Sequence, residues 1–228
     1  HLFRGQPDIR IDYTFINDNV AKTMSQVASL NCGWTLTGTD STSYHLEGTR
    51  TNPTRLFQLD DRRFHVNDKP AGRTATGWAA SWNRQAGIAV GVRHFWQNWP
   101  KSLTVGQRGL SVGILPGFPK GTYDGRPIRD EAKLFYYLRN GEYSFKIGVA
   151  KTHEMWATFL PGKPDPAKLD KHFQSLQQRL LAQASPERIA ATGVLGAMPP
   201  ARPGPTAGYD KWFSGFLDKH IHGQEEVR

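Results

Sequence analysis

The stretch Gly77–Pro116, GWAASWNRQAGIAVGVRHFWQNWPKSLTVGQRGLSVGILP, decides the fold. Its centre alternates apolar Ile88, Val90 and Val92 with small side chains, a period of two that is typical of a β-strand with two distinct faces. A second alternating run, residues 110–114, follows a connection that contains glycine. The sequence therefore predicts two β-strands here, with a polar and aromatic segment, residues 93–101, between them.

Short alternating runs of the same kind recur on both sides of this stretch. They cover residues 9–15, 55–59, 63–66 and 143–149. Turn residues separate them, and Asn140-Gly141 is the clearest hairpin signal because both residue types accept a positive φ. Short strands divided by turns are the pattern of an antiparallel β-sandwich, which we predict for residues 1–160 of a mainly β chain.

The pattern changes after Leu160, where prolines and helical spacing replace the alternation. Asp165 is suited to cap a helix that has Pro166 at its first position. Further on, residues 209–220 place aromatic side chains at helical spacing, which predicts an amphipathic helix that buries its aromatic side. We therefore predict a short helical and linker extension over residues 161–228.

The composition narrows the classes of partner. The 228 residues carry a formal net charge of +9, which favours a polyanionic partner: nucleic acid, acidic polysaccharide or an anionic surface. The cations are scattered instead of forming a Lys/Arg block, which argues against nucleic acid.

Cys32 is the only cysteine, so an intrachain disulfide and a cysteine-based zinc site are excluded. No apolar run approaches about 18 residues, so we expect no membrane partner.

The candidate binding residues lie in the segment after Val92. They are Arg93, His94, Trp96, Gln97, Asn98, Trp99 and Lys101. Arginine and lysine bind carboxylates, tryptophan rings stack on flat ligands, and side-chain amides bind hydroxyl groups. The segment therefore predicts a surface that faces a sugar chain with acidic groups.

A structural role is the alternative interpretation of the same segment. In that case the tryptophans belong to the core and the polar groups form hydrogen bonds with a neighbouring loop. A smaller polar group, Gln58, Asp60, Asp61 and Arg63, has the same two interpretations.

Metal and nucleophile motifs are weak in this chain. His65, His94 and His153 are spread over separate predicted strands, without the short spacing of a metal site, so we predict no metal site. Residues 109–113 match the letters G-x-S-x-G, but Ser111 lies inside a predicted strand, whereas a nucleophile elbow needs a sharp turn between strand and helix. We therefore predict no catalytic serine and no resident cofactor.

Several segments resemble the central domain of exo-acting rhamnogalacturonan lyases and their YetA-like relatives. They are IRIDYTFINDN (9–19), LFQLDDRRFHVN (56–67), GWAASWNRQAGIAVGVRHFWQNWPKSL (77–103), IGVAKTHEMWATF (147–159) and SPERIAATGVLG (185–196). The resemblance implies a large mutarotase-like supersandwich, placed between an N-terminal β domain and an α/α-toroid domain. It also implies that this chain is a piece of a longer protein whose toroid would follow residue 228.

The resemblance further implies an activity on rhamnogalacturonan or related pectic glycans by β-elimination beside a uronic acid. Such a step needs a group that neutralises the carboxylate, a base for the C5 proton and an acid for the leaving oxygen. Because the toroid is absent, we expect this chain to support or edge the cleft and not to catalyse alone. The substrate class favours a secreted or periplasmic protein, and a metal such as calcium in the full-length enzyme stays open.

Two other functions are compatible with the same sequence. One is a non-catalytic carbohydrate-binding module. The other is a mutarotase-like sugar epimerase, with His94 or His153 as the acid and Glu154 as the base. His153 and Glu154 are adjacent, so in a strand they point to opposite faces.

Overall fold

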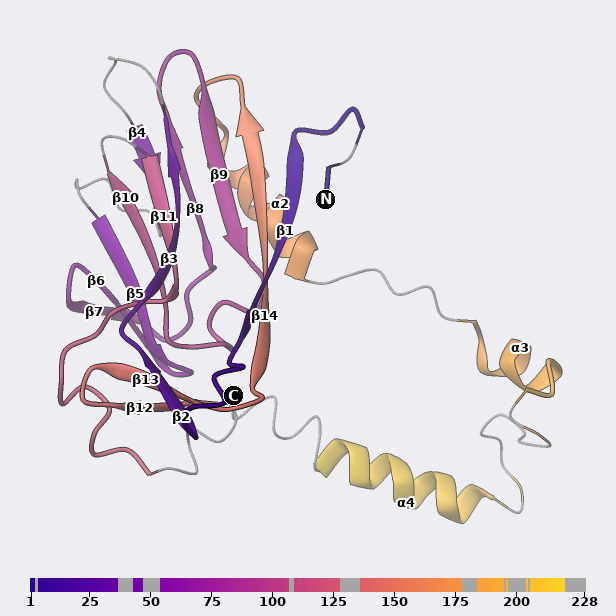
Figure 1. Ribbon diagram of the computed structural model, residues 1–228. Helices are drawn as coiled ribbons and strands as arrows, with labels where there is room; N and C mark the ends of the chain where they lie inside the picture. The colour runs from indigo at the N-terminus through magenta and orange to yellow at the C-terminus, as the bar shows by residue number, and fades with distance from the viewer. Residues whose placement is uncertain are drawn as a thin grey trace. The chain divides into compact units, whose positions relative to one another are not determined.

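The computed structural model describes residues 1–2, 4–36, 43–46, 54–106, 109–127, 136–177, 184–194, 196, 204 and 206–219. The chain divides into two compact units, His1–Gln178 and Arg179–Arg228. The first unit is the predicted antiparallel β-sandwich (Figure 1). It also contains helix α2 (Pro166–Gln177), which lies beyond the predicted boundary at residue 160.

Two large antiparallel sheets form the layers of the sandwich (Figure 1). The five-stranded sheet has the order β1 (Asp8–Ile16), β14 (Ala150–Leu160), β9 (Gly87–Val92), β8 (Trp78–Trp82) and β4 (Ser43–His45). The six-stranded sheet has the order β3 (Leu30–Thr35), β11 (Gly109–Leu115), β10 (Lys101–Gly106), β5 (Thr54–Asp60), β6 (Arg63–Val66) and β7 (Lys69–Gly72). Apolar residues from both sheets, such as Val90, Leu103 and Met155, form one buried core.

A small three-stranded sheet lies at one end of the sandwich (Figure 1). Its order is β12 (Tyr137–Arg139), β13 (Glu142–Lys146) and β2 (Met24–Val27). The β12–β13 hairpin turns at Asn140 and Gly141, whose φ angles of 53° and 80° require residue types that accept the left-handed region. The Asn-Gly signal in the sequence therefore predicted this hairpin correctly.

Helix α2 (Pro166–Gln177) covers the outer face of the five-stranded sheet. The Asp165 side chain accepts a hydrogen bond of 2.9 Å from the Ala167 N–H and so caps the helix, as the sequence predicts. Leu169 and Phe173 are buried against Trp78, Ala80 and Ala89. Small residues on the sheet allow this close packing: a Cβ atom at Gly91 would lie 2.2 Å from the Phe173 ring.

The second unit contains helices α3 (Pro186–Ala191) and α4 (Ala207–Leu217). Ser185 caps α3, because its hydroxyl accepts a hydrogen bond from the Arg188 N–H. The α4 aromatic residues stack on one another, but Tyr209 and Trp212 are 64% and 62% exposed. The predicted burial of this aromatic side is therefore not seen within the unit, and His220, the last residue of the predicted helical pattern, lies outside the described residues.

Candidate functional site

A sharp turn after β9 carries the predicted binding segment. His94 adopts a φ of 52°, and its carbonyl accepts a hydrogen bond of 2.9 Å from the Asn98 N–H. The Gln177 side chain, at the end of α2, holds the turn from the other side. Its Oε1 accepts the His94 N–H at 2.8 Å and its Nε2 donates to the Val92 carbonyl at 3.0 Å. The position of the turn therefore depends on the docking of α2.

A hollow of about 430 Å³ lies between this turn, the end of α2 and the segment before β8. Its lining residues are Thr74, Ala75, Thr76, Trp78, His94, Phe95, Trp96, Gln97, Gln174 and Gln177. The volume is that of a small-ligand site. His94 and Gln97 are exposed and Trp96 is half-buried, so these side chains are accessible at its rim.

The lining of the hollow is polar but almost uncharged. His94 is the one titratable residue among its lining residues. Hydroxyl and amide groups from threonine and glutamine occupy the polar positions, beside the ring of Trp96. Such groups form hydrogen bonds with uncharged hydroxyl-bearing ligands, and the ring can stack on a sugar face.

Three of the seven predicted binding residues line the hollow: His94, Trp96 and Gln97. Asn98 is half-buried and is not among the lining residues. Arg93 is also outside it, and its Nη1 lies 3.5 Å from the Glu154 carboxylate. That carboxylate also lies 3.4 Å from Arg10 Nη2 and accepts a hydrogen bond from Trp156. Arg93 thus belongs to an ion-pair network on the face of the five-stranded sheet that α2 covers.

Trp99 and Lys101 require a correction, because both side chains are sealed in the fold. Trp99 is 6% exposed and Lys101 is 0% exposed. Lys101 Nζ donates to the carbonyls of Ile114, at 2.7 Å, and Pro100, at 3.3 Å. In this conformation neither side chain can contact a ligand, so the structural interpretation holds for these two residues.

The buried Lys101 lies in a basic interior together with Lys151 and His153. Burial, and then the charge of Lys151, holds the pKa of Lys101 well below its ordinary value. Burial, followed by the charges of Lys101 and Lys151, lowers the pKa of His153 to about 2. His153 is therefore neutral near pH 7 and a poor proton donor, which weighs against its role as the acid of an epimerase.

Replacing Lys151 with methionine is expected to stabilise the protein at pH 7 and to have little effect near pH 10. Burial lowers the pKa of Lys151 from 10.5 to about 8. Between these values the unfolded chain binds more protons, so stability rises with pH. The protonated amine costs on the order of 3 kcal/mol at pH 7, and the variant lacks this cost. Urea unfolding of both proteins at pH 7, 8.5 and 10 checks the prediction, and a pH-independent difference would contradict it.

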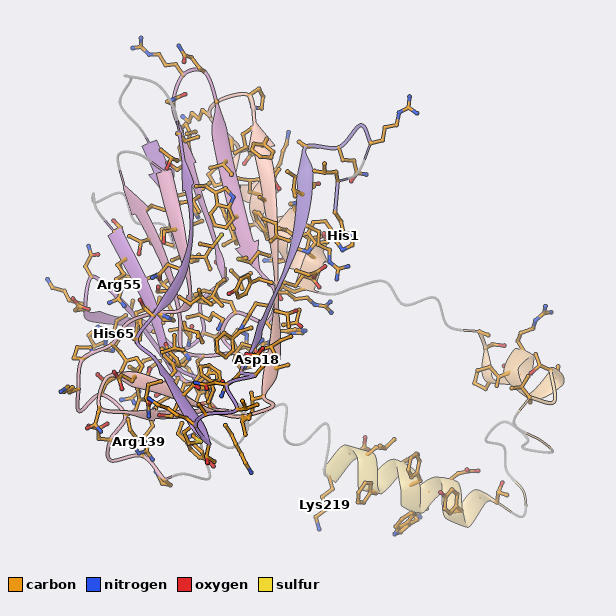
Figure 2. The ribbon with its side chains drawn as sticks, in the orientation of Figure 1. His1, Asp18, Arg55, His65, Arg139 and Lys219 are labelled. Carbon is orange, nitrogen blue, oxygen red and sulfur yellow. The ribbon has the colours of Figure 1, made fainter. Side chains whose placement is uncertain are left out.

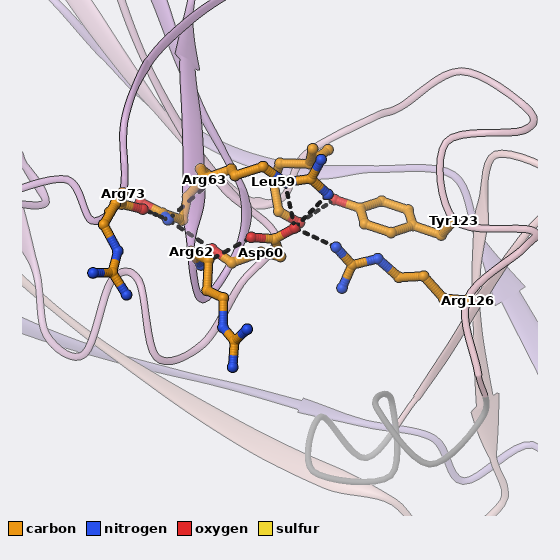
Figure 3. Close-up of polar contacts among 8 residues, drawn as sticks. Leu59, Asp60, Arg62, Arg63, Arg73, Tyr123 and Arg126 are labelled. Atoms are coloured by element: carbon orange, nitrogen blue, oxygen red, sulfur yellow. Dashed lines mark hydrogen bonds and ion pairs between the residues drawn. The ribbon is translucent and has the colours of Figure 1, made fainter. Parts of the chain in front are cut away.

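A second polar cluster surrounds Asp60 at the end of β5 (Figure 3). The carboxylate is buried and accepts hydrogen bonds from the Arg62 N–H at 2.8 Å and from Arg63 Nη2 at 2.7 Å. It also pairs with Arg126. Burial raises the pKa of Asp60, but the hydrogen bonds from Arg63 and Arg62 and the charges of Arg126 and Arg63 outweigh burial and leave this pKa below its ordinary value.

The Asp60 cluster contacts one residue of the predicted binding segment, Trp99. The Arg126 guanidinium lies 4.9 Å from the centre of the Trp99 ring and 5.5 Å from that of Tyr123. The Tyr123 hydroxyl donates to the Leu59 carbonyl at 2.6 Å. Sequence reasoning missed Arg126 and Tyr123, because they come from a Gly- and Pro-rich loop without periodicity.

Two of the histidines considered as metal ligands, His65 and His153, lie in different sheets. His65 lies on β6 of the six-stranded sheet (Figure 2), whereas His153 lies on β14 of the other sheet. Within the described parts of the chain, no three His, Cys, Asp or Glu residues are grouped so that they could hold a metal ion. No described helix is long and apolar enough to cross a membrane.

Comparison with known proteins gives no further constraint on the function. No protein-family model matches this sequence, and no curated protein matches it.

Proposed function

We propose that the sandwich unit binds a glycan chain at the hollow between the His94 turn and α2. We further propose that it is the β-sandwich domain of a polysaccharide lyase-like enzyme that acts on rhamnogalacturonan or related pectic glycans. The observation that carries the binding role is the lining itself: accessible amides and hydroxyl groups beside the half-buried Trp96 ring. The lyase context rests on the resemblance of five sequence segments, together with the antiparallel sandwich.

Binding fits the hollow better than catalysis does. β-Elimination beside a uronate needs charge neutralisation, a base and an acid. The lining residues provide one titratable group, His94, and neither a lysine nor an arginine. We therefore assign the chemical step to residues outside the hollow, including those that flanking domains would supply.

Replacing Trp96 with alanine is expected to weaken binding of rhamnogalacturonan oligosaccharides about tenfold, and Gln97→Ala a few-fold. The first change removes the ring on which a sugar would stack, at a cost of about 1.4 kcal/mol. The second removes an exposed amide that forms no hydrogen bond with any described residue. Isothermal titration of the whole chain measures both effects.

Two matched variants serve as controls for these changes. Trp212→Ala removes an exposed tryptophan on α4, and Gln85→Ala removes an exposed amide in the turn between β8 and β9. Neither residue lines the hollow, so both variants should bind as the wild type does. Wild-type protein that shows no binding, or hollow variants that bind as tightly as the controls, would disprove the binding role.

A further inference from the structure

Four arginines lie in or near the turn that joins β5 to β6; we call Arg62, Arg63, Arg73 and Arg126 the arginine edge. Two of them, Arg63 and Arg126, pair with the Asp60 carboxylate, and the Arg62 N–H donates to it. The segments that carry these arginines, residues 60–63, 73 and 123–126, contain three carboxylates, Asp60, Asp61 and Asp124, so the four cations outnumber the anions by one. Asp60 is already paired with Arg63 and Arg126. The arginine edge therefore carries positive charge that its own carboxylates do not neutralise.

The side chains of Arg62 and Arg73 supply the accessible part of this charge. Both residues are exposed, and their guanidinium groups extend away from Asp60 (Figure 3). Their backbone groups are engaged in hydrogen bonds, but neither guanidinium pairs with a residue that the structure describes. Arg126 is held in place by Asp60 and by the rings of Trp99 and Tyr123, with 21% of its side chain exposed.

One buried amide links the backbone of the arginine edge to one wall of the hollow. Gln58 is 0% exposed, and its Nε2 donates to the carbonyls of Asp60, at 2.6 Å, and Arg73, at 2.9 Å. Its Oε1 accepts the Ala75 N–H at 3.0 Å. Thr74, Ala75 and Thr76 line the hollow. Arg73 therefore directly precedes the wall of the hollow in the chain, and the Gln58 side chain fixes its backbone.

We propose that the arginine edge binds the carboxylates of an acidic glycan whose neighbouring sugar units occupy the hollow. This inference rests on the proposed glycan-binding function and adds a selection for free carboxylates. A guanidinium group can hold a carboxylate through two parallel hydrogen bonds, which an ester cannot accept with the same charge. The hollow then binds the hydroxyl groups of the glycan, while Arg62 and Arg73 bind its carboxylates.

An acidic glycan fits this surface better than a nucleic acid does. Proteins that bind single strands without sequence preference stack successive bases on several accessible aromatic rings along a basic groove. Among the residues that line the hollow, Trp78 and Phe95 are buried, and the accessible rings are one tryptophan, the half-buried Trp96, and the imidazole of His94. The other accessible lining residues include the amides and hydroxyl groups suited to sugar units.

The test compares rhamnogalacturonan oligosaccharides with free and with methyl-esterified carboxylates, titrated into the whole chain. The wild type is expected to bind the free acid about tenfold more tightly than the ester. The Arg62→Ala/Arg73→Ala variant should lose this preference, keep its affinity for the ester within about twofold, and show a weaker dependence on salt. Arg4→Ala/Arg84→Ala removes two exposed arginines from other loops and serves as the charge-matched control.

Each outcome supports or overturns carboxylate binding by the arginine edge. Equal wild-type affinity for acid and ester, or an equal loss of acid binding in both double variants, overturns this inference and leaves the binding role of the hollow intact. Failure of the wild type to bind either oligosaccharide overturns the proposed function and the inference with it. If a single-stranded DNA oligonucleotide of matched charge binds more tightly than the free-acid oligosaccharide, the preferred ligand is a nucleic acid. That result would overturn the proposed selection for glycan carboxylates.

Discussion

Replacing Asp60 with alanine is expected to lower the free energy of unfolding by about 3 kcal/mol at pH 7. The side chain is 4% exposed, and the variant would leave Arg126 without the anion that it faces. It would also remove the acceptor of the Arg62 N–H and of Arg63. Breaking one partner of a buried ion pair typically costs about 3–5 kcal/mol, and the exposure of Arg63 places the expectation at the lower end. Urea unfolding followed by circular dichroism measures the effect.

Asp68→Ala is the matched control for the Asp60 variant. Its carboxylate is 92% exposed and lies 3.9 Å from Arg55 Nη1, and exposed ion pairs of this kind contribute little to stability. The wild type should also lose stability in acid relative to the Asp60 variant. The pKa of Asp60 is lowered in the folded state, so its contribution is full above the ordinary value of 3.8 and disappears as the pH falls through the folded pKa. Equal losses in the two variants at pH 7 would contradict the structural role of the Asp60 cluster.

Replacing Phe173 with alanine is expected to lower the free energy of unfolding by about 3 kcal/mol and to weaken glycan binding as well. The ring is 3% exposed and stacks on Trp78, with ring centres 5.5 Å apart. Removing a buried phenylalanine leaves a cavity and typically costs about 3–5 kcal/mol. Because α2 also provides Gln174 and Gln177, loose docking of the helix would disturb the wall of the hollow. Urea unfolding and oligosaccharide titration provide the two measurements.

Phe213→Ala, on α4, offers a comparison for the Phe173 variant. Phe213 is 43% exposed, so its loss should leave both stability and binding nearly unchanged. Hydrogen exchange of α2 amides separates two explanations of weak binding by Phe173→Ala. Rapid exchange confined to α2 indicates local detachment of the helix, whereas uniform loss of protection indicates global unfolding. An α2 that stays fully protected while binding is lost would contradict the proposed link between docking and the hollow.

Local patterns in the sequence predicted the strands well, because each pattern expresses a difference between the two faces of a strand. In β9 both faces are buried: the large residues face the core of the sandwich and the small ones face α2. The alternation at Ile88, Val90 and Val92 corresponds to β9, and the Asn140-Gly141 signal corresponds to the β12–β13 turn. Asp165 and Pro166 likewise predicted the start of α2. We placed the boundary at residue 160 because the alternating pattern ends there. However, α2, which follows, packs on the five-stranded sheet.

The prediction of the site was less complete, and Lys101 shows one reason. Leu103 and Val105 share its side of β10, so the same alternation that predicted the strands directs Lys101 into the core. The charge of lysine suggested an exposed side chain, but the carbonyl acceptor of Ile114 satisfies the buried amine, and burial lowers its pKa and so makes the charged form less favoured. The pairing of Asp60 with Arg126 had no local signal, because the two residues are 66 positions apart.

The contact between Gln177 and the His94 turn determines where the protein could be shortened. A polypeptide that stops after Leu160 would contain every described strand of the sandwich, but it would lack Gln177, which holds the turn, and Gln174, which also lines the hollow. Such a fragment could form both sheets and still fail to bind the proposed glycan. The minimal excisable module therefore extends at least to Gln177, and a negative result with anything shorter would not count against carbohydrate recognition.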